Sequence, residues 1–143
     1  MPVATALTIR PAEPADHDAL QALWEDCGLG RAAPDEWAAL MSGNTAVVLV
    51  AVDRSSIVGT SVASFDGWRA YIYHVAVASG WRRQGIAHQL IEAAEQYLLT
   101  GGARYVFVTV DQERPEALAL VASEGYLPEG EIVLAKRLAT RMT

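Results

Sequence analysis

Residues 71–87 decide the fold: the chain reads Tyr71-Ile72-Tyr73-His74-Val75-Ala76-Val77 and, three residues later, Trp81-Arg82-Arg83-Gln84-Gly85-Ile86-Ala87. The first part is typical of a β-strand, and the second is a cationic turn at the start of an amphipathic helix. The first amides of a helix have no partner inside it, and the helix dipole favours negative charge there. Gly85 allows a close approach of the backbone, Ala87 adds little bulk, and Arg82 and Arg83 add positive charge. The stretch therefore predicts a site for a phosphate-bearing ligand.

Three apolar runs predict consecutive antiparallel strands around the middle of the chain. The first run is rich in valine, as in a strand that is buried on both faces. Asp66-Gly67, between the second and the third run, is a strong hairpin signal. The predicted strands are Ala46–Val52, Ile57–Phe65 and Tyr71–Val77.

The chain after the cationic turn predicts a parallel crossover. Apolar residues from Ile86 to Leu98 recur at helical spacing. A strand at Tyr105–Val110 follows, and the helical connection makes it parallel to Tyr71–Val77 in the usual right-handed sense. The remaining predicted elements are a helix from Pro115, which Gly125 ends, and a last strand at Glu131–Leu138.

The N-terminal part predicts a strand at Leu7–Arg10, a helix from Asp16 that carries Trp24 and Cys27, and a helix from Pro34 that carries Trp37. The order β-α-α-β-β-β-α-β-α-β joins an antiparallel half to a parallel βαβ half. We therefore expect one α+β domain over residues 1–143, with a mixed central sheet of about six to seven strands flanked by helices. Because strands and helices do not alternate throughout, a doubly wound nucleotide-binding fold is disfavoured.

The composition indicates a folded protein with no nucleic-acid or membrane partner. Of the 143 residues, 52% are hydrophobic and 20% are charged, which is typical of a globular domain. The net charge of −6 argues against nucleic acid, and no apolar run reaches the about 18 to 20 residues of a membrane span. Cys27 is the only cysteine, so no intrachain disulfide is possible. We expect no signal peptide, no metal site and a cytoplasmic location.

The chain resembles the GNAT superfamily of acyl-CoA N-acyltransferases over nearly its whole length. The family signature, Arg or Gln followed by x-x-Gly-x-Gly/Ala, matches Arg82 to Ala87, and it stands between the expected strand and helix. The segment Leu118 to Tyr126 resembles the family's later helix and its Gly-Tyr exit. The sequence Phe65-Asp66-Gly67 is similar to a small group of uncharacterised bacterial members.

The resemblance implies acetyl-CoA as the acyl donor and an amine as the acceptor. The pyrophosphate would be held by the backbone amides of four residues, with two arginines nearby; these are Gln84, Gly85, Ile86 and Ala87, with Arg82 and Arg83. The pantetheine arm would lie between diverging parallel strands, against the backbone of Val75, Ala76 and Val77. Ordinary core packing of the valine side chains is compatible with this role. The resemblance also allows a homodimer, because members of the family often dimerise.

The sequence departs from the family pattern at the residues that move protons. The family's base carboxylate corresponds to a position near Tyr71, but no Asp or Glu lies between Tyr71 and Val77. The family's frequent Tyr acid corresponds to Val121, and the usual Asn at the start of that helix corresponds to Arg114. Proton transfer must therefore come from another residue, pass through water, or be absent.

Two residues are candidates for the catalytic base, His74 and Asp66. His74 lies beside the expected acyl site and histidine titrates near neutral pH, although a histidine held in a strand by hydrogen bonds is the alternative. Asp66 could face the acceptor amine, although the first residue of an Asp-Gly turn is usually structural. Side chains that could line the acceptor pocket are Trp68, Arg69, Tyr71 and Tyr73. Trp24 and Trp37 are predicted to be core residues.

Three functions are compatible with these observations. The first is an acetyl-CoA-dependent N-acetyltransferase that acts on a primary amine of a small molecule or a peptide. The second is a non-catalytic acyl-CoA-binding or sensing module, which the missing Tyr acid would suit. The third, a generic nucleotide-binding regulator, is disfavoured by the order of the strands.

Overall fold

The computed structural model describes residue 4 and residues 6–139. The chain divides into two compact units, Met1–Val108 and Thr109–Thr143. Each unit is described by itself. None of the helices among the described residues has the length and hydropathy that a membrane span needs.

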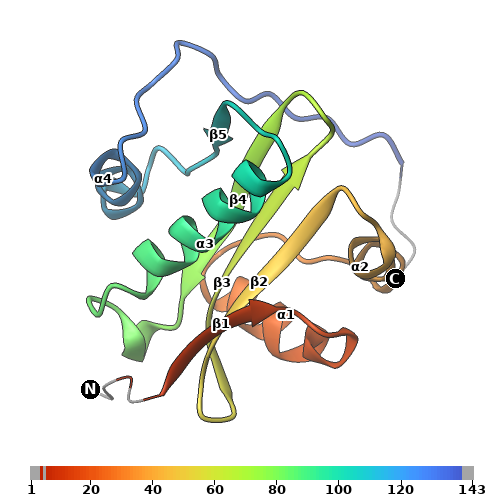
Figure 1. Cartoon of the computed structure of the whole chain (residues 1–143), viewed down its shortest axis with the longest axis vertical. Helices are drawn as coiled ribbons and strands as arrows, with labels where there is room; N and C mark the ends of the chain where they lie inside the picture. Colours follow the sequence, from red (N-terminus) through yellow and green to blue (C-terminus); the bar gives the residue numbers. More distant parts are fainter. Residues whose placement is uncertain (1–3, 5, 140–143) are drawn as a thin grey trace. The chain divides into compact units, whose positions relative to one another are not determined.

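The first unit is built on a five-stranded mixed sheet with the order β1-β2-β3-β4-β5 (Figure 1). Neighbours from β1 to β4 are antiparallel, and β5 is parallel to β4. This confirms the α+β class and the junction of an antiparallel half with a parallel crossover. The strands are β1 (Leu7–Pro11), β2 (Ala46–Asp53), β3 (Ser56–Phe65), β4 (Ala70–Val77) and β5 (Val106–Val108).

Helices cover both faces of this sheet (Figure 1). On one face α3 (Ile86–Thr100) packs through a stripe of buried residues at helical spacing, among them Leu90 and Ala94. On the other face α1 (His17–Asp26) and α2 (Pro34–Ser42) pack against β2, β3 and β4. Trp24 and Trp37 are core residues of that layer, as predicted. Two short 3-10 helices, η1 (Pro14–Asp16) and η2 (Ser79–Trp81), precede α1 and α3.

The second unit contains α4 (Pro115–Ser123), which confirms the predicted late helix. The predicted strand at Glu131–Leu138 is wrong, because these residues belong to no strand. Their side chains are solvent-exposed, with Ile132 at 80% and Leu134 at 83%. An apolar run indicates an extended segment, but a strand also needs a neighbour that supplies its hydrogen bonds. Over residues 6–139 the sheet therefore has five strands instead of six to seven, and the strand predicted at Tyr105–Val110 is limited to β5.

Candidate functional site

The turn before α3 has the geometry of an anion site. Arg83 and Gly85 both have positive φ, +63° and +76°, so two residues of this turn have a left-handed backbone before Ile86 begins the helix. Within the described part of the chain, no side chain caps the start of α3. A Cβ built on Gly85 would meet no atom of the described residues within 4 Å, so none of them fills the space above this residue. The main-chain amides of Gly85, Ile86 and Ala87 can thus donate hydrogen bonds to a bound anion, as main-chain nests and helix starts commonly do.

The two arginines of this turn differ in what they contact. Arg82 Nε donates to the carbonyl oxygen of Val77 at 3.1 Å, and its Nη2 lies 3.8 Å from the Sγ of the buried Cys27. The Arg82 guanidinium therefore ties the end of β4 to the end of α1. Arg83 is exposed beside Gly85. Gln84 turns its side chain toward the start of the chain, where its Oε1 accepts a hydrogen bond from the Ala4 amide at 2.8 Å.

β4 and β5 are paired over only three residues each. The last pair is Ile72 with Val108, and β4 continues to Val77 with no partner on that side among the described residues. On its other side β4 stays paired with β3 as far as Val77. The side chains of Ala76 and Val77 are buried, so core packing and an accessible main chain coexist here. A strand edge of this kind can pair with an amide-bearing ligand, because such a ligand presents the donors and acceptors of a peptide.

A bulge interrupts β4 at His74. Thr60 pairs with Ala76 and Val62 pairs with Tyr73, so two residues of β4 face one residue of β3. His74 has a φ of +50°, a left-handed conformation that costs about 1 to 3 kcal/mol in a residue other than glycine. Backbone strain of this kind is concentrated at functional sites.

The His74 ring is held by several neighbours. Its Nε2 lies 2.8 Å from the carbonyl oxygen of Gly30, in the connection between α1 and α2. The rings of Trp24 and Tyr73 contact it edge-on, with centroid distances of 5.2 and 5.5 Å. A carbonyl oxygen can only accept, so Nε2 carries the hydrogen, and the neutral ring then has its lone pair on Nδ1. Burial raises the pKa of the neighbouring Tyr73 hydroxyl.

Asp66 lies in the hairpin turn between β3 and β4. Its Oδ1 accepts hydrogen bonds from the main-chain amides of Arg69 and Trp68, each at 2.8 Å. These two donors lower the pKa of the Asp66 carboxyl, with the Arg69 amide as the largest contributor. The eight residues of β4, at about 3.3 Å each, separate this turn from the turn at Arg82 by roughly 25 Å. The structure therefore does not bring Asp66 to the anion site.

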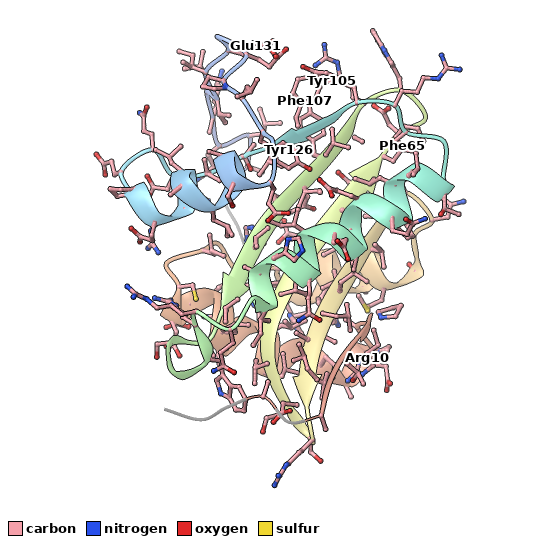
Figure 2. All side chains as sticks on the ribbon, turned by 60° about the vertical axis from the view of Figure 1, so that its left-hand side comes forward. Arg10, Phe65, Tyr105, Phe107, Tyr126 and Glu131 are labelled. Atoms are coloured by element: carbon pink, nitrogen blue, oxygen red, sulfur yellow. The ribbon has the colours of Figure 1, made fainter. Side chains whose placement is uncertain are left out.

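Aromatic side chains gather where β4 and β5 are paired (Figure 2). Tyr71 stacks on Phe107 with a centroid distance of 5.4 Å, and Tyr105 meets Phe107 edge-on at 5.2 Å. The guanidinium of Arg69 lies 5.2 Å from the Phe107 ring centroid and 5.5 Å from that of Trp68. Tyr105 and Phe107 were not among the site residues predicted from the sequence. Their spacing of two residues places both on one face of a strand, but nothing local shows that Phe107 pairs with Tyr71.

Comparisons with known proteins identify the family and the fold of the chain. Residues 11–126 match the model of the acetyltransferase (GNAT) family. An acetyltransferase of Yersinia pestis is 27% identical over 135 residues, which are 92% of this chain and 96% of the relative. An aminoglycoside acetyltransferase from an uncultured soil metagenomic sample, solved with sisomicin, superposes with a TM-score of 0.78 at 26% identity, covering 94% of this chain and 97% of the other. An aminoglycoside N-acetyltransferase solved with CoA shares the fold, with a TM-score of 0.77 at 16% identity over 93% and 95% of the two chains.

Proposed function

The chain belongs to the acetyltransferase (GNAT) family, and we propose that it transfers the acetyl group of acetyl-CoA to a primary amine of a small molecule or a peptide. The observation that carries this proposal is the pairing of two features at the end of β4. The helix start at Gly85, which no described side chain caps, suits a diphosphate, and the edge of β4 beyond Ile72, which no described strand pairs, suits an amide-bearing arm. A generic phosphate ligand would need only the first.

We assign the diphosphate to the amides of the turn, with Arg83 as the nearby cation. The residues of this subsite are Arg83, Gln84, Gly85, Ile86 and Ala87. Arg82 supports it indirectly, because its guanidinium holds the Val77 carbonyl and contacts Cys27. The backbone of Val75, Ala76 and Val77 then lies where the arm would pair. A main-chain N–H of this segment can also stabilise the negative oxygen that develops on a thioester carbonyl during attack.

We propose His74 as the base that accepts the proton of the amine, directly or through a water molecule. An alkylammonium must lose its proton before its nitrogen can attack a carbonyl. His74 stands at the bulge of β4, and its bond to Gly30 leaves Nδ1 as the basic nitrogen of the neutral ring. Asp66 is the weaker candidate, because two main-chain amides occupy its Oδ1 in a turn at the far end of β4. The departing thiolate needs little help, because a thiol has a pKa near ~8.5.

Calorimetric titration with acetyl-CoA, followed by a screen of amines that records free thiol, tests the proposal. We expect saturable binding at sub-millimolar concentration and thiol release that depends on the amine. No binding in this range would overturn the assignment of the donor. Tight binding without thiol release across a broad amine panel would leave acyl-CoA sensing, the function that Val121 at the position of the family's Tyr acid would suit.

A further inference from the structure

The connection between α1 and α2, residues 27–33, carries the carbonyl group that orients His74. The Gly30 carbonyl oxygen accepts the hydrogen bond from His74 Nε2 at 2.8 Å. The Trp24 ring of α1 contacts the same imidazole edge-on, at a centroid distance of 5.2 Å. The imidazole is therefore held on two sides, and the carbonyl selects the tautomer with its hydrogen on Nε2. Whatever places the Gly30 carbonyl thus also decides where Nδ1 of His74 lies.

The middle of this connection is fixed by Gln21, a buried residue of α1. Its Oε1 accepts a hydrogen bond from the Ala32 amide at 3.1 Å, and its Nε2 donates to the Ala32 carbonyl oxygen at 2.9 Å. His17 Nε2 donates to the same carbonyl oxygen at 3.0 Å, and the His17 ring stacks on Trp37 of α2. Three hydrogen bonds thus hold Ala32, which stands two residues after Gly30.

Gln21 is a polar residue at a core position. Only 8% of it is exposed, and the other buried residues of α1 are Leu20, Leu23 and Trp24. A buried amide group costs free energy unless its oxygen and its nitrogen are both paired, and here the main chain of Ala32 pairs both. An apolar side chain would suit this core position, but it would hold no part of the connection. The hydrogen bonds of Gln21 therefore specify the path of the connection.

The two ends of the connection are held independently of Gln21. At the α1 end the Leu29 amide donates to a carbonyl oxygen of α1 at 2.8 Å, and at the α2 end the Ala33 amide donates to a carboxylate oxygen of α2 at 2.9 Å. Loss of the Gln21 bonds should therefore release the residues between these two ends, among them Gly30, and leave both helices in place. A shift of about 1 Å takes the Gly30 oxygen out of hydrogen-bond range of His74.

Resting on the proposed function, in which His74 is the base, we propose that Gln21 is a positioning residue for acetyl transfer. By fixing Ala32 it sets the Gly30 carbonyl, which keeps the hydrogen of the neutral imidazole on Nε2 and the lone pair on Nδ1. Gln21 acts only through this connection and moves no proton itself. His17 supports the same carbonyl of Ala32 with one of the three hydrogen bonds.

The experiment compares Gln21→Met with the control Leu23→Val. Gln21→Met keeps a side chain of similar length and removes both bonds to Ala32, whereas Leu23→Val removes one methylene group from the same buried face of α1 and no hydrogen bond. Urea unfolding reports the stability of both variants. The tautomer of His74 is read from the ¹⁵N and ¹H signals of its ring at about pH 8, where an ordinary histidine is neutral. His74→Asn identifies these signals by their absence, and thiol release from acetyl-CoA gives the rates.

We expect the Nε2–H form of His74 to dominate in the unmodified chain and in Leu23→Val. In Gln21→Met the ratio of the Nε2–H form to the Nδ1–H form should fall about two- to tenfold, which corresponds to the loss of one hydrogen bond. The kcat should fall by a similar factor while KM for acetyl-CoA stays nearly unchanged, because the turn before α3 is not altered. His17→Phe keeps a ring on Trp37 and removes one of the three bonds, so its effect should be smaller.

The tautomer and the rate separate the inference from the proposed function. An unchanged tautomer ratio in Gln21→Met overturns the inference, whatever the rate. An equal fall of kcat in Leu23→Val also overturns it, because the rate would then follow stability and not the connection. A tautomer shift with an unchanged kcat rejects His74 as the base, and with it the positioning role of Gln21. A tautomer shift in a chain that releases no thiol with any amine supports the placement of His74 by Gln21 and rejects the acetyltransferase proposal.

Discussion

Replacement of Gly85 by valine is the most direct test of the anion site. Gly85 has a φ of +76°, so any other residue there is strained. We expect a loss of about 1 to 3 kcal/mol in the free energy of unfolding from this strain. No steric term is added, because a Cβ at this position meets no atom within 4 Å. The fold should therefore survive the substitution.

The effect on acetyl-CoA binding should be much larger than the effect on folding. The valine side chain would fill the open space above the turn and keep a phosphate from the amides of Gly85 and Ile86. A hydrogen bond to a charged group contributes about 1.5 to 3 kcal/mol, so the loss of two costs about 3 to 6 kcal/mol. The dissociation constant for acetyl-CoA should rise more than ~100-fold, as measured by calorimetry.

Gly102 supplies a matched control at the other end of α3. Its φ is +103°, and a Cβ there also meets no atom within 4 Å. Gly102→Val should lose a similar free energy in urea unfolding but change the dissociation constant less than about threefold. An affinity for acetyl-CoA that is unchanged in Gly85→Val would refute the placement of the diphosphate. Equal loss of affinity would show that strain anywhere in α3, and not the turn itself, controls binding.

Three further predictions concern side chains. His74→Asn, which keeps a residue tolerant of positive φ, should lower the rate of acetyl transfer near neutral pH, whereas an unchanged rate would exclude His74 as the base. Arg83→Gln should weaken acetyl-CoA binding with little change in the free energy of unfolding. Arg82→Gln should lower the free energy of unfolding in urea by about 1 kcal/mol, because it removes the hydrogen bond to Val77. The reverse pattern would exchange the roles assigned to the two arginines. The hydrogen bond with Arg10 at 2.8 Å lowers the pKa of the Asp16 carboxyl below 3.8, so this pair stabilises the fold above that pH and loses its contribution as the pH falls through the lowered pKa. The free energy of unfolding of Asp16→Asn should therefore change less with pH, between about pH 5 and 2, than that of the unmodified chain. Parallel curves for the two proteins would contradict this.

The elements that could be predicted from the sequence are those whose signals are local. Two segments indicate their conformation through their own residues, the apolar run Ala46–Val52 and the turn Asp66-Gly67. Both lie in the structure where they were expected. The helix start at Ile86 follows from the same kind of evidence, because Gly85 and the apolar stripe after it lie within four turns of chain. Membership of the acetyltransferase (GNAT) family followed from these local signals and their order.

The features that could not be predicted depend on residues far apart in the sequence. Phe107 reaches Tyr71 only because the crossover through α3 sets the register between β5 and β4. The bond from His74 to Gly30 joins residues 44 positions apart. The wrong prediction at Glu131–Leu138 has the same origin. The residues of that run indicate an extended backbone, but they do not show whether a neighbouring strand pairs with it. From the sequence alone Asp66 is a candidate base, because nothing local shows how far β4 separates it from the turn at Arg82.

The bulge at His74 has a consequence for the whole of β4. Side chains alternate along a strand, so without an extra residue Tyr71, Tyr73, Val75 and Val77 would all lie on one face. The bulge adds one residue, and the alternation reverses across it: Tyr73 packs with α1 and α2, whereas Val75 and Val77 pack with α3. One strand can thus present its aromatic half to an acceptor on the α1–α2 side while its valine half stays anchored against α3, beside the turn that opens that helix. The strained His74 stands at the crossing point, between the aromatic half of β4 and the edge along which we propose that the CoA arm pairs.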